Sequence, residues 1–126
     1  MLILDSGGVT RLAERTRGAA AMIAALRREG LWPPIVPVVV LPECLTGDGS
    51  RDAAENRLLK TCDVPESVPA GLARRAAWLR SRARCGSAVD ALVTAAAEPG
   101  GTVLTSDPAD LRSLAAFTES VSVAPV

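Results

Sequence analysis

Four carboxylates of this chain stand where they could do chemistry together, although they are far apart in the sequence: Asp5, Glu43, Asp90 and Asp107. Asp5 ends an apolar run, and Glu43 and Asp107 each follow an expected strand by two residues. Asp90 lies near the start of the helix that leads into the strand before Asp107. Because functional clefts of parallel sheets lie beyond the carboxyl ends of the strands, we expect the four acids to converge on one rim.

A cluster of this kind needs a compensating positive charge. Two carboxylates about 4 Å apart repel each other by roughly 4 kcal/mol at an effective dielectric constant of about 20. The chain has no histidine, and its three cysteines are widely spaced, so the available ligands are hard oxygens, which favour Mg²⁺ or Mn²⁺ over zinc. Such an ion suits phosphate chemistry, because it polarises a phosphoryl oxygen and generates the attacking hydroxide.

Each acid taken singly also has a simpler role, the capping of a helix. Asp90 follows Ser87 by three residues, the spacing of a capping box. Asp107, with Asp110 three residues later, is typical of a helix start. Glu43 would stabilise the positive end of a helix dipole. Both interpretations stay open for each residue, and the joint placement of the four favours a site.

The elements that must position these acids alternate along the chain. Strands are expected over residues 2–4, 35–41, 66–69, 102–105 and 121–123, and helices over residues 9–16, 19–29, 51–62, 70–84, 87–98 and 108–117. Residues 5–8 are expected to form a tight turn. Residues 35–41 are apolar except for Pro37, which is typical of a strand covered on both faces. The alternation predicts an α/β fold with a parallel sheet and right-handed crossovers.

Length and composition narrow the class of protein. A chain of 126 residues with 48% apolar residues fits one folded domain over residues 1–126. It has no apolar run near the roughly 18 residues of a membrane span, so no membrane role is expected. The apolar run at the N-terminus is too short for a signal peptide, and it lacks the basic leader that a signal peptide carries. Three cysteines without a pairing pattern indicate a reducing, cytoplasmic location.

One segment of this electrically neutral chain is strongly basic. Residues 71–86 carry five arginines and no acid. Arg74, Trp78 and Arg82 recur every four residues, so one helical face could present guanidinium groups and a stacking ring to RNA. The alternative, a solvated helix face with Trp78 half-buried, is the more common situation and is favoured here.

Taken in order, the motifs around the four acids resemble the PIN-domain nucleases. They are Leu4-Asp5-Ser6, the apolar residues 38–41 followed by Glu43, Asp90 within residues 87–93, and Leu104-Thr105-Ser106-Asp107. The resemblance covers the whole chain and is strongest to the toxins of VapBC-type toxin–antitoxin systems. It implies a three-layer sandwich with a parallel sheet of about five strands, and a Mg²⁺- or Mn²⁺-dependent endoribonuclease. It also implies an antitoxin partner and a homodimer.

The resemblance assigns roles to individual residues. Asp5, Asp90 and Asp107 are expected to hold the metal, and Glu43 to orient a water molecule or take its proton. Ser6 and Thr105 are expected to bind ligands or the phosphate, and Asp110 is an alternative fourth acid. Whether one or two ions bind stays open. The sequence departs from the family at Ser6-Gly7-Gly8, which is expected to loosen the turn after Asp5.

Two other classes of protein are alternatives to the nuclease. The first is a non-catalytic PIN-like module that binds RNA or protein and uses its acids only as helix caps. The second is a phospho-acceptor receiver domain, which needs a lysine after a late strand. That class ranks last, because the single lysine, Lys60, falls in an expected helix.

Overall fold

The structure, a computed structural model, describes residues 1–126. Its strands are β1 (Leu2–Leu4), β2 (Thr102–Thr105) and β3 (Ser122–Pro125). Its helices are α1 (Ser6–Ala13), α2 (Arg17–Arg28), the 3-10 helix η1 (Val38–Val40), α3 (Leu41–Cys44), α4 (Ala53–Leu59), α5 (Ala70–Ala83), α6 (Ala88–Ala96) and α7 (Pro108–Ala115). No helix combines the length and the apolar composition that a membrane crossing requires.

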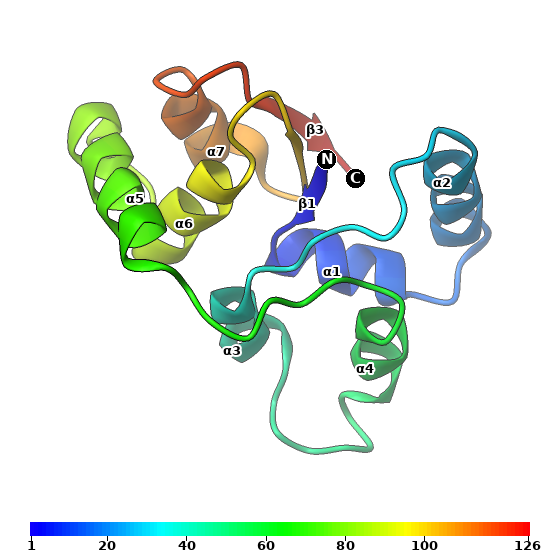
Figure 1. The fold of residues 1–126 in the computed structure, drawn as a ribbon. Helices are drawn as coiled ribbons and strands as arrows, with labels where there is room; N and C mark the ends of the chain where they lie inside the picture. The colour runs from blue at the N-terminus through cyan, green and yellow to red at the C-terminus, as the bar shows by residue number, and fades with distance from the viewer.

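The three strands form one parallel sheet in the order β1-β2-β3. Ile3 lies opposite Val103, and Leu104 lies opposite Ala124. All three residues of β1 are buried, as expected of a parallel strand covered on both faces. Figure 1 shows α5, α6 and α7 on one side of the strands and α1, α2 and α4 on the other. The expected α/β architecture with a parallel sheet is therefore confirmed.

The expectation of about five strands is wrong, because the sheet has three. Beyond β1 the sheet continues only as isolated bridges, from Ile3 to Ile35 and from Ile35 to Asp63. The valines expected in a strand form η1 instead, closed by a hydrogen bond from the Val40 N–H to the Pro37 carbonyl at 2.9 Å. Pro37 has no N–H to give to a ladder, which explains why pairing stops there.

Two further expectations are corrected. Residues 66–69 form no strand, and the prolines at both ends of this segment account for that. Residues 5–8 do not form a tight turn: Asp5 is the N-cap of α1, and Ser6 begins the helix, three residues before the expected start at Val9.

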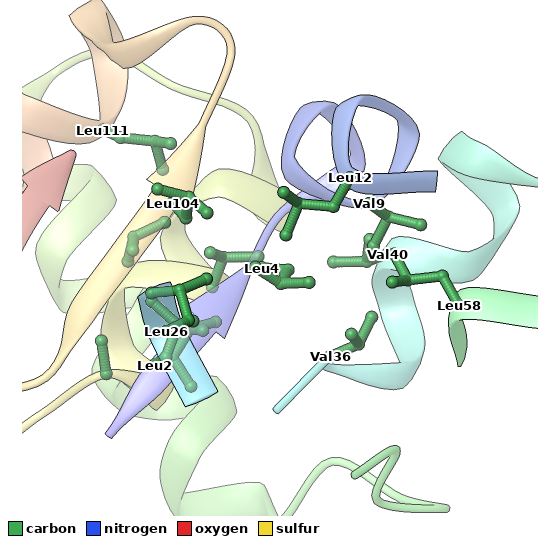
Figure 2. Close-up of a cluster of buried hydrophobic side chains, with 14 of the residues drawn as sticks. Leu2, Leu4, Val9, Leu12, Leu26, Val36, Val40, Leu58, Leu104 and Leu111 are labelled. Carbon is green, nitrogen blue, oxygen red and sulfur yellow. The ribbon is translucent and has the colours of Figure 1, made fainter. Parts of the chain in front are cut away.

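The core consists of two apolar clusters. The larger one joins the sheet to α1, η1 and α4, and Figure 2 shows Leu4 in its middle, between Val9 and Leu12 on one side and Leu104 on the other. The smaller one fills the space between α5, α6 and α7 with Ala76, Leu79, Ala91, Ala95 and Leu114. Both depend on small aliphatic side chains, since the chain has only two tryptophans and one phenylalanine.

The first turn of α1 lies directly against the end of β2. A Cβ atom added to Gly8 would overlap the backbone carbonyl oxygen of Leu104, and one added to Gly7 would overlap the Ser106 side chain. These two glycines therefore permit an approach that no larger residue allows. Rather than loosening the turn after Asp5, they hold it tightly against the neighbouring strand.

We expect Gly8→Ala to lower the free energy of unfolding by about 1–3 kcal/mol, because the added methyl group displaces backbone rather than a flexible side chain. Gly71→Ala in α5 is the matched control, since a Cβ there meets nothing within 4 Å. It should leave the stability unchanged or raise it by about 0.5–1 kcal/mol. Urea denaturation followed by circular dichroism measures both, and equal effects of the two variants would contradict this account.

Candidate functional site

Asp5 is held by two hydrogen bonds that come from different parts of the chain. Its Oδ1 accepts from the N–H of Gly8 at 2.7 Å, which caps α1. Its Oδ2 accepts from the hydroxyl of Thr105, the last residue of β2, at 2.5 Å. The buried Thr105 hydroxyl also accepts from the N–H of Asp107 at 3.0 Å. The Asp5 carboxylate is therefore fixed in place at the edge where β1 and β2 end.

Asp90 takes part in the capping box that the sequence suggested. The N–H of Ser87 donates to Oδ2 of Asp90 at 2.9 Å, and the N–H of Asp90 donates to the Ser87 hydroxyl at 3.0 Å. The other oxygen, Oδ1, accepts no hydrogen bond from the protein. Capping thus occupies one oxygen of Asp90 and leaves the second one available.

Glu43 forms a group with Asp5 and Asp90, whose charges act on it. Its pKa is raised by the loss of surrounding water and then by the charges of Asp90 and Asp5. The pKa of Asp5 is raised chiefly by burial, partly opposed by the hydrogen bonds from Thr105 and Gly8, and raised again by the charge of Asp90. Asp90 therefore lies near enough to Asp5 and Glu43 for its charge to raise the pKa of both.

Asp107 and Asp110 stand apart from this group. Both are exposed in the first turn region of α7, and neither contributes to the raised pKa of Asp5 or Glu43. Asp107 occupies the N-cap position, yet its side chain makes no capping hydrogen bond. Its link to the three acids runs through its backbone, which donates to the hydroxyl of Thr105. Of the four acids expected on one rim, Asp107 is therefore the one without an electrostatic link to Asp5 or Glu43.

A polar cleft with a volume of about 450 Å³ includes one of the three acids, Glu43, in its lining. No apolar residue lines it; the lining consists of Ser6, Gly7, Thr10, Arg11, Glu14, Glu43 and Ser106. The sequence analysis missed Thr10, Arg11, Glu14 and Ser106. Residues 6, 10 and 14 follow the spacing of one helix face, but that signal was hidden because the helix was expected to begin at Val9.

The three acids could bind a divalent cation that keeps part of its water shell, but they do not form a closed ligand set around it. No three acid or cysteine side chains are close enough together to enclose an ion. Glu43 accepts no hydrogen bond, and one oxygen of Asp90 is free, so hard oxygen ligands are available. Mg²⁺ typically keeps several waters and binds through one or two carboxylates. The residues present therefore fit such an ion bound partly through water.

The basic face of α5 differs from the expected one by one residue. The guanidinium groups of Arg75 and Arg82 lie 4.5 Å and 5.2 Å from the centre of the Trp78 ring. Arg75 is fixed by two hydrogen bonds to Glu98, at 2.9 Å and 3.0 Å. Arg74 is exposed and does not lie over the ring. Trp78 is 42% exposed, so its surroundings match the solvated face that the sequence favoured.

Comparison with known proteins identifies a similar fold and no family. No protein-family model matches the chain, and no curated protein matches it. Among solved structures, the crystal structure of PAE2754 from Pyrobaculum aerophilum is similar, with a TM-score of 0.63 and 15% sequence identity. The match covers 97% of this chain and 89% of that one. At this identity the likeness concerns the fold alone, and a shared fold does not establish a shared function.

The raised pKa values of Asp5 and Glu43 predict how stability depends on pH. Above the ordinary values of 3.8 and 4.5, the folded chain holds protons that the unfolded chain has lost, so the free energy of unfolding falls as the pH rises through this window. Asp5→Asn removes one such group. Its stability relative to the wild type should therefore increase from about pH 4 towards about pH 7.

Urea denaturation across this pH range measures the effect, and Thr105→Val provides a comparison. That variant removes a hydrogen bond that lowers the pKa of Asp5, so its stability should fall more steeply with pH than that of the wild type. Parallel pH profiles of stability for all three proteins would show that folding does not raise the pKa of Asp5.

Proposed function

We propose that this protein is a Mg²⁺- or Mn²⁺-dependent endoribonuclease of the PIN-domain type, acting as the toxin of a toxin–antitoxin pair. The observation that carries the proposal is that Glu43 lines a cleft without apolar residues and feels the charges of Asp90 and Asp5. Clustered carboxylates raise one another's pKa and so favour a bound cation. A wholly polar cleft suits a charged backbone better than an apolar substrate.

The surrounding residues orient the acids through hydrogen bonds. Gly8 and Thr105 orient Asp5, and Ser87 orients Asp90, so these two carboxylates can hold a cation without rearranging. A divalent cation held by these carboxylates would supply polarisation of a phosphoryl oxygen and a lower pKa for a nearby water. We assign Asp107 as the fourth acid, since Thr105 ties its backbone to Asp5 and its side chain makes no hydrogen bond. Asp110, one helical turn further along α7, is its auxiliary.

Glu43 is suited to accept a proton, because its carboxylate is unpaired and its pKa is raised. In the proposed reaction the oxygen of a water molecule forms a bond to phosphorus while Glu43 takes its proton. The bond between phosphorus and the 3′ oxygen breaks, and the 3′ oxygen is protonated from solvent. The products carry a 5′-phosphate and a 3′-hydroxyl.

The exposed arginines of α5 would supply a second contact with RNA. Arg74 and Arg82 are exposed, and α5 carries no acid, so the helix attracts phosphates through charge alone. Trp78 offers less to a base than the sequence suggested, because two guanidinium groups already lie over its ring.

A second groove supports the proposed antitoxin partner. It lies between α1, α2 and α4, has a volume of about 280 Å³ and is lined mainly by apolar side chains. Arg15, Arg27 and Arg57 also line it, and none of them forms an ion pair. The indole N–H of Trp32 is buried there without an acceptor. An acidic amphipathic segment would complement such a groove. A homodimer and a cytoplasmic location belong to the same proposal.

One alternative has an observation in its favour. The capping box of Asp90 and the capping role of Asp5 are complete without any ion, and no three acids form a closed ligand group. These features are compatible with a non-catalytic module that binds RNA or protein. Metal binding separates the two functions.

We expect the wild type to bind Mn²⁺ in a calorimetric titration and to cleave a fluorescently labelled RNA in its presence. Asp5→Asn and Asp90→Asn should lose both properties; asparagine keeps an oxygen for the helix caps, so folding is retained. Glu43→Gln should bind Mn²⁺ but lower kcat roughly 10²–10⁴-fold, the usual share of a general base. Glu29→Gln, at the exposed end of α2, is the matched control.

Two outcomes would decide against the nuclease. Cleavage retained by both Asp5→Asn and Asp90→Asn would exclude the proposed site. Absence of Mn²⁺ binding by the folded wild type would favour the non-catalytic module.

The antitoxin proposal predicts that the short reading frame immediately upstream encodes a protein that co-purifies with this chain. Charge reversal at Arg27, for instance Arg27→Glu, should weaken the complex and release the nuclease activity, whereas Arg28→Glu on the neighbouring exposed position should not. Co-expression followed by size-exclusion chromatography measures this. A complex insensitive to Arg27 would place the partner elsewhere.

A further inference from the structure

Arg11 is the one basic residue that lines the polar cleft. It lies on α1, on the wall that also carries Ser6, Thr10 and Glu14, while Glu43 contributes from α3. The nuclease proposal assigns no role to Arg11, although it shares this cleft with Glu43. A cation on the wall of a cleft proposed for a polyanion is therefore unexplained.

The ion pair of Arg11 leaves most of its guanidinium free. One nitrogen, Nη1, lies 3.0 Å from Oε2 of Glu14, and the side chains are 58% and 40% exposed. Exposed pairs of this kind contribute little to stability, and no other hydrogen bond engages Arg11. A planar guanidinium with several unused N–H groups can grip a phosphate with two parallel hydrogen bonds. Glu14 holds the side chain near the cleft and competes with an incoming anion.

Three hydroxyl groups line the same cleft as Arg11 and Glu43. Ser6 and Thr10 lie one turn apart on α1, and Ser106 faces Gly7 across the close contact with β2. None of these three hydroxyls makes a hydrogen bond within the protein, so each is free to donate. From Ser6 to Arg11 the helix rises about 7.5 Å, at about 1.5 Å per residue. This separation is comparable with that of neighbouring phosphates on one RNA strand.

We propose that Arg11, together with the hydroxyls of Ser6 and Thr10, forms a binding subsite for the phosphate next to the cleaved one in single-stranded RNA. This inference rests on the proposed nuclease function. Arg11 is a positioning residue: it binds the backbone beside the reacting phosphate and does not touch the reacting atoms. Glu14 limits the affinity of the subsite by competing for the same guanidinium.

The subsite can be tested without any cleavage. Fluorescence anisotropy with a labelled single-stranded RNA of mixed sequence, in EDTA, measures binding alone. We expect Arg11→Gln to weaken binding several-fold and to reduce the slope of log K against log salt concentration by about 0.7, the value for one phosphate contact on a single strand. Arg28→Gln on α2, equally basic and exposed, should change neither.

Glu14→Gln is the decisive comparison. Both variants break the same surface ion pair, so a purely structural role predicts the same small change in stability and the same change in RNA binding. The subsite predicts opposite signs, with weaker RNA binding for Arg11→Gln and tighter binding for Glu14→Gln. Changes of the same sign, or an unaltered salt slope in Arg11→Gln, would overturn the inference.

The result is separable from that of the nuclease proposal. With Mn²⁺ present, Arg11→Gln should raise KM and leave kcat nearly unchanged, as expected for lost binding that is equal in ground and transition states. If the wild type never cleaves RNA but binds it through Arg11 in EDTA, the nuclease function fails and the subsite stands. If cleavage requires Asp5 and ignores Arg11, the subsite alone fails.

Discussion

The hydrogen bond from the Thr105 hydroxyl to the Asp5 carboxylate is the constraint on which the candidate site depends. It joins residues 100 positions apart and fixes the end of β1 against the end of β2. It is possible only because Gly7 and Gly8 let the first turn of α1 lie against the strand without a side chain between them. Burial at this junction raises the pKa of Asp5, and the hydrogen bond from Thr105 that orients the carboxylate partly opposes that rise.

The fold tolerates this concentration of charge because the same residues support local structure. Asp5 is the N-cap of α1, a position worth about 0.5–2 kcal/mol, and Asp90 completes the capping box that Ser87 begins at α6. These gains partly offset the repulsion among the three acids. Capping and ion binding are therefore compatible roles of one carboxylate, since a cap uses one oxygen of Asp90 and leaves the other free. Glu43, which has no such local role, is the most exposed of the three.

Elements with strong local signals could be predicted from the sequence, and elements set by distant contacts could not. The strands at residues 2–4 and 102–105 have the predicted bounds, and α5 differs from its prediction by one residue. The valines of η1 have strand propensity, but Pro37 and Pro42 remove the donors a ladder requires. The start of α1 depends on the close approach of Gly8 to the backbone of Leu104. The position of the Arg75 side chain depends on its hydrogen bond to Glu98. Likewise the sequence predicted four converging acids, of which Asp107 has no electrostatic link to Asp5 or Glu43, and the α1 wall of the cleft was not predicted.

The order of the elements in the chain has a consequence for biosynthesis. β1 precedes all the helices, yet its sheet partner β2 comes after helices α1 to α6 in the chain. Pairings so distant in sequence form late and slowly. A ribosome that has translated six of the seven helices therefore still holds a chain in which Asp5 lacks its threonine partner. The acidic rim is assembled only after β2 has been translated.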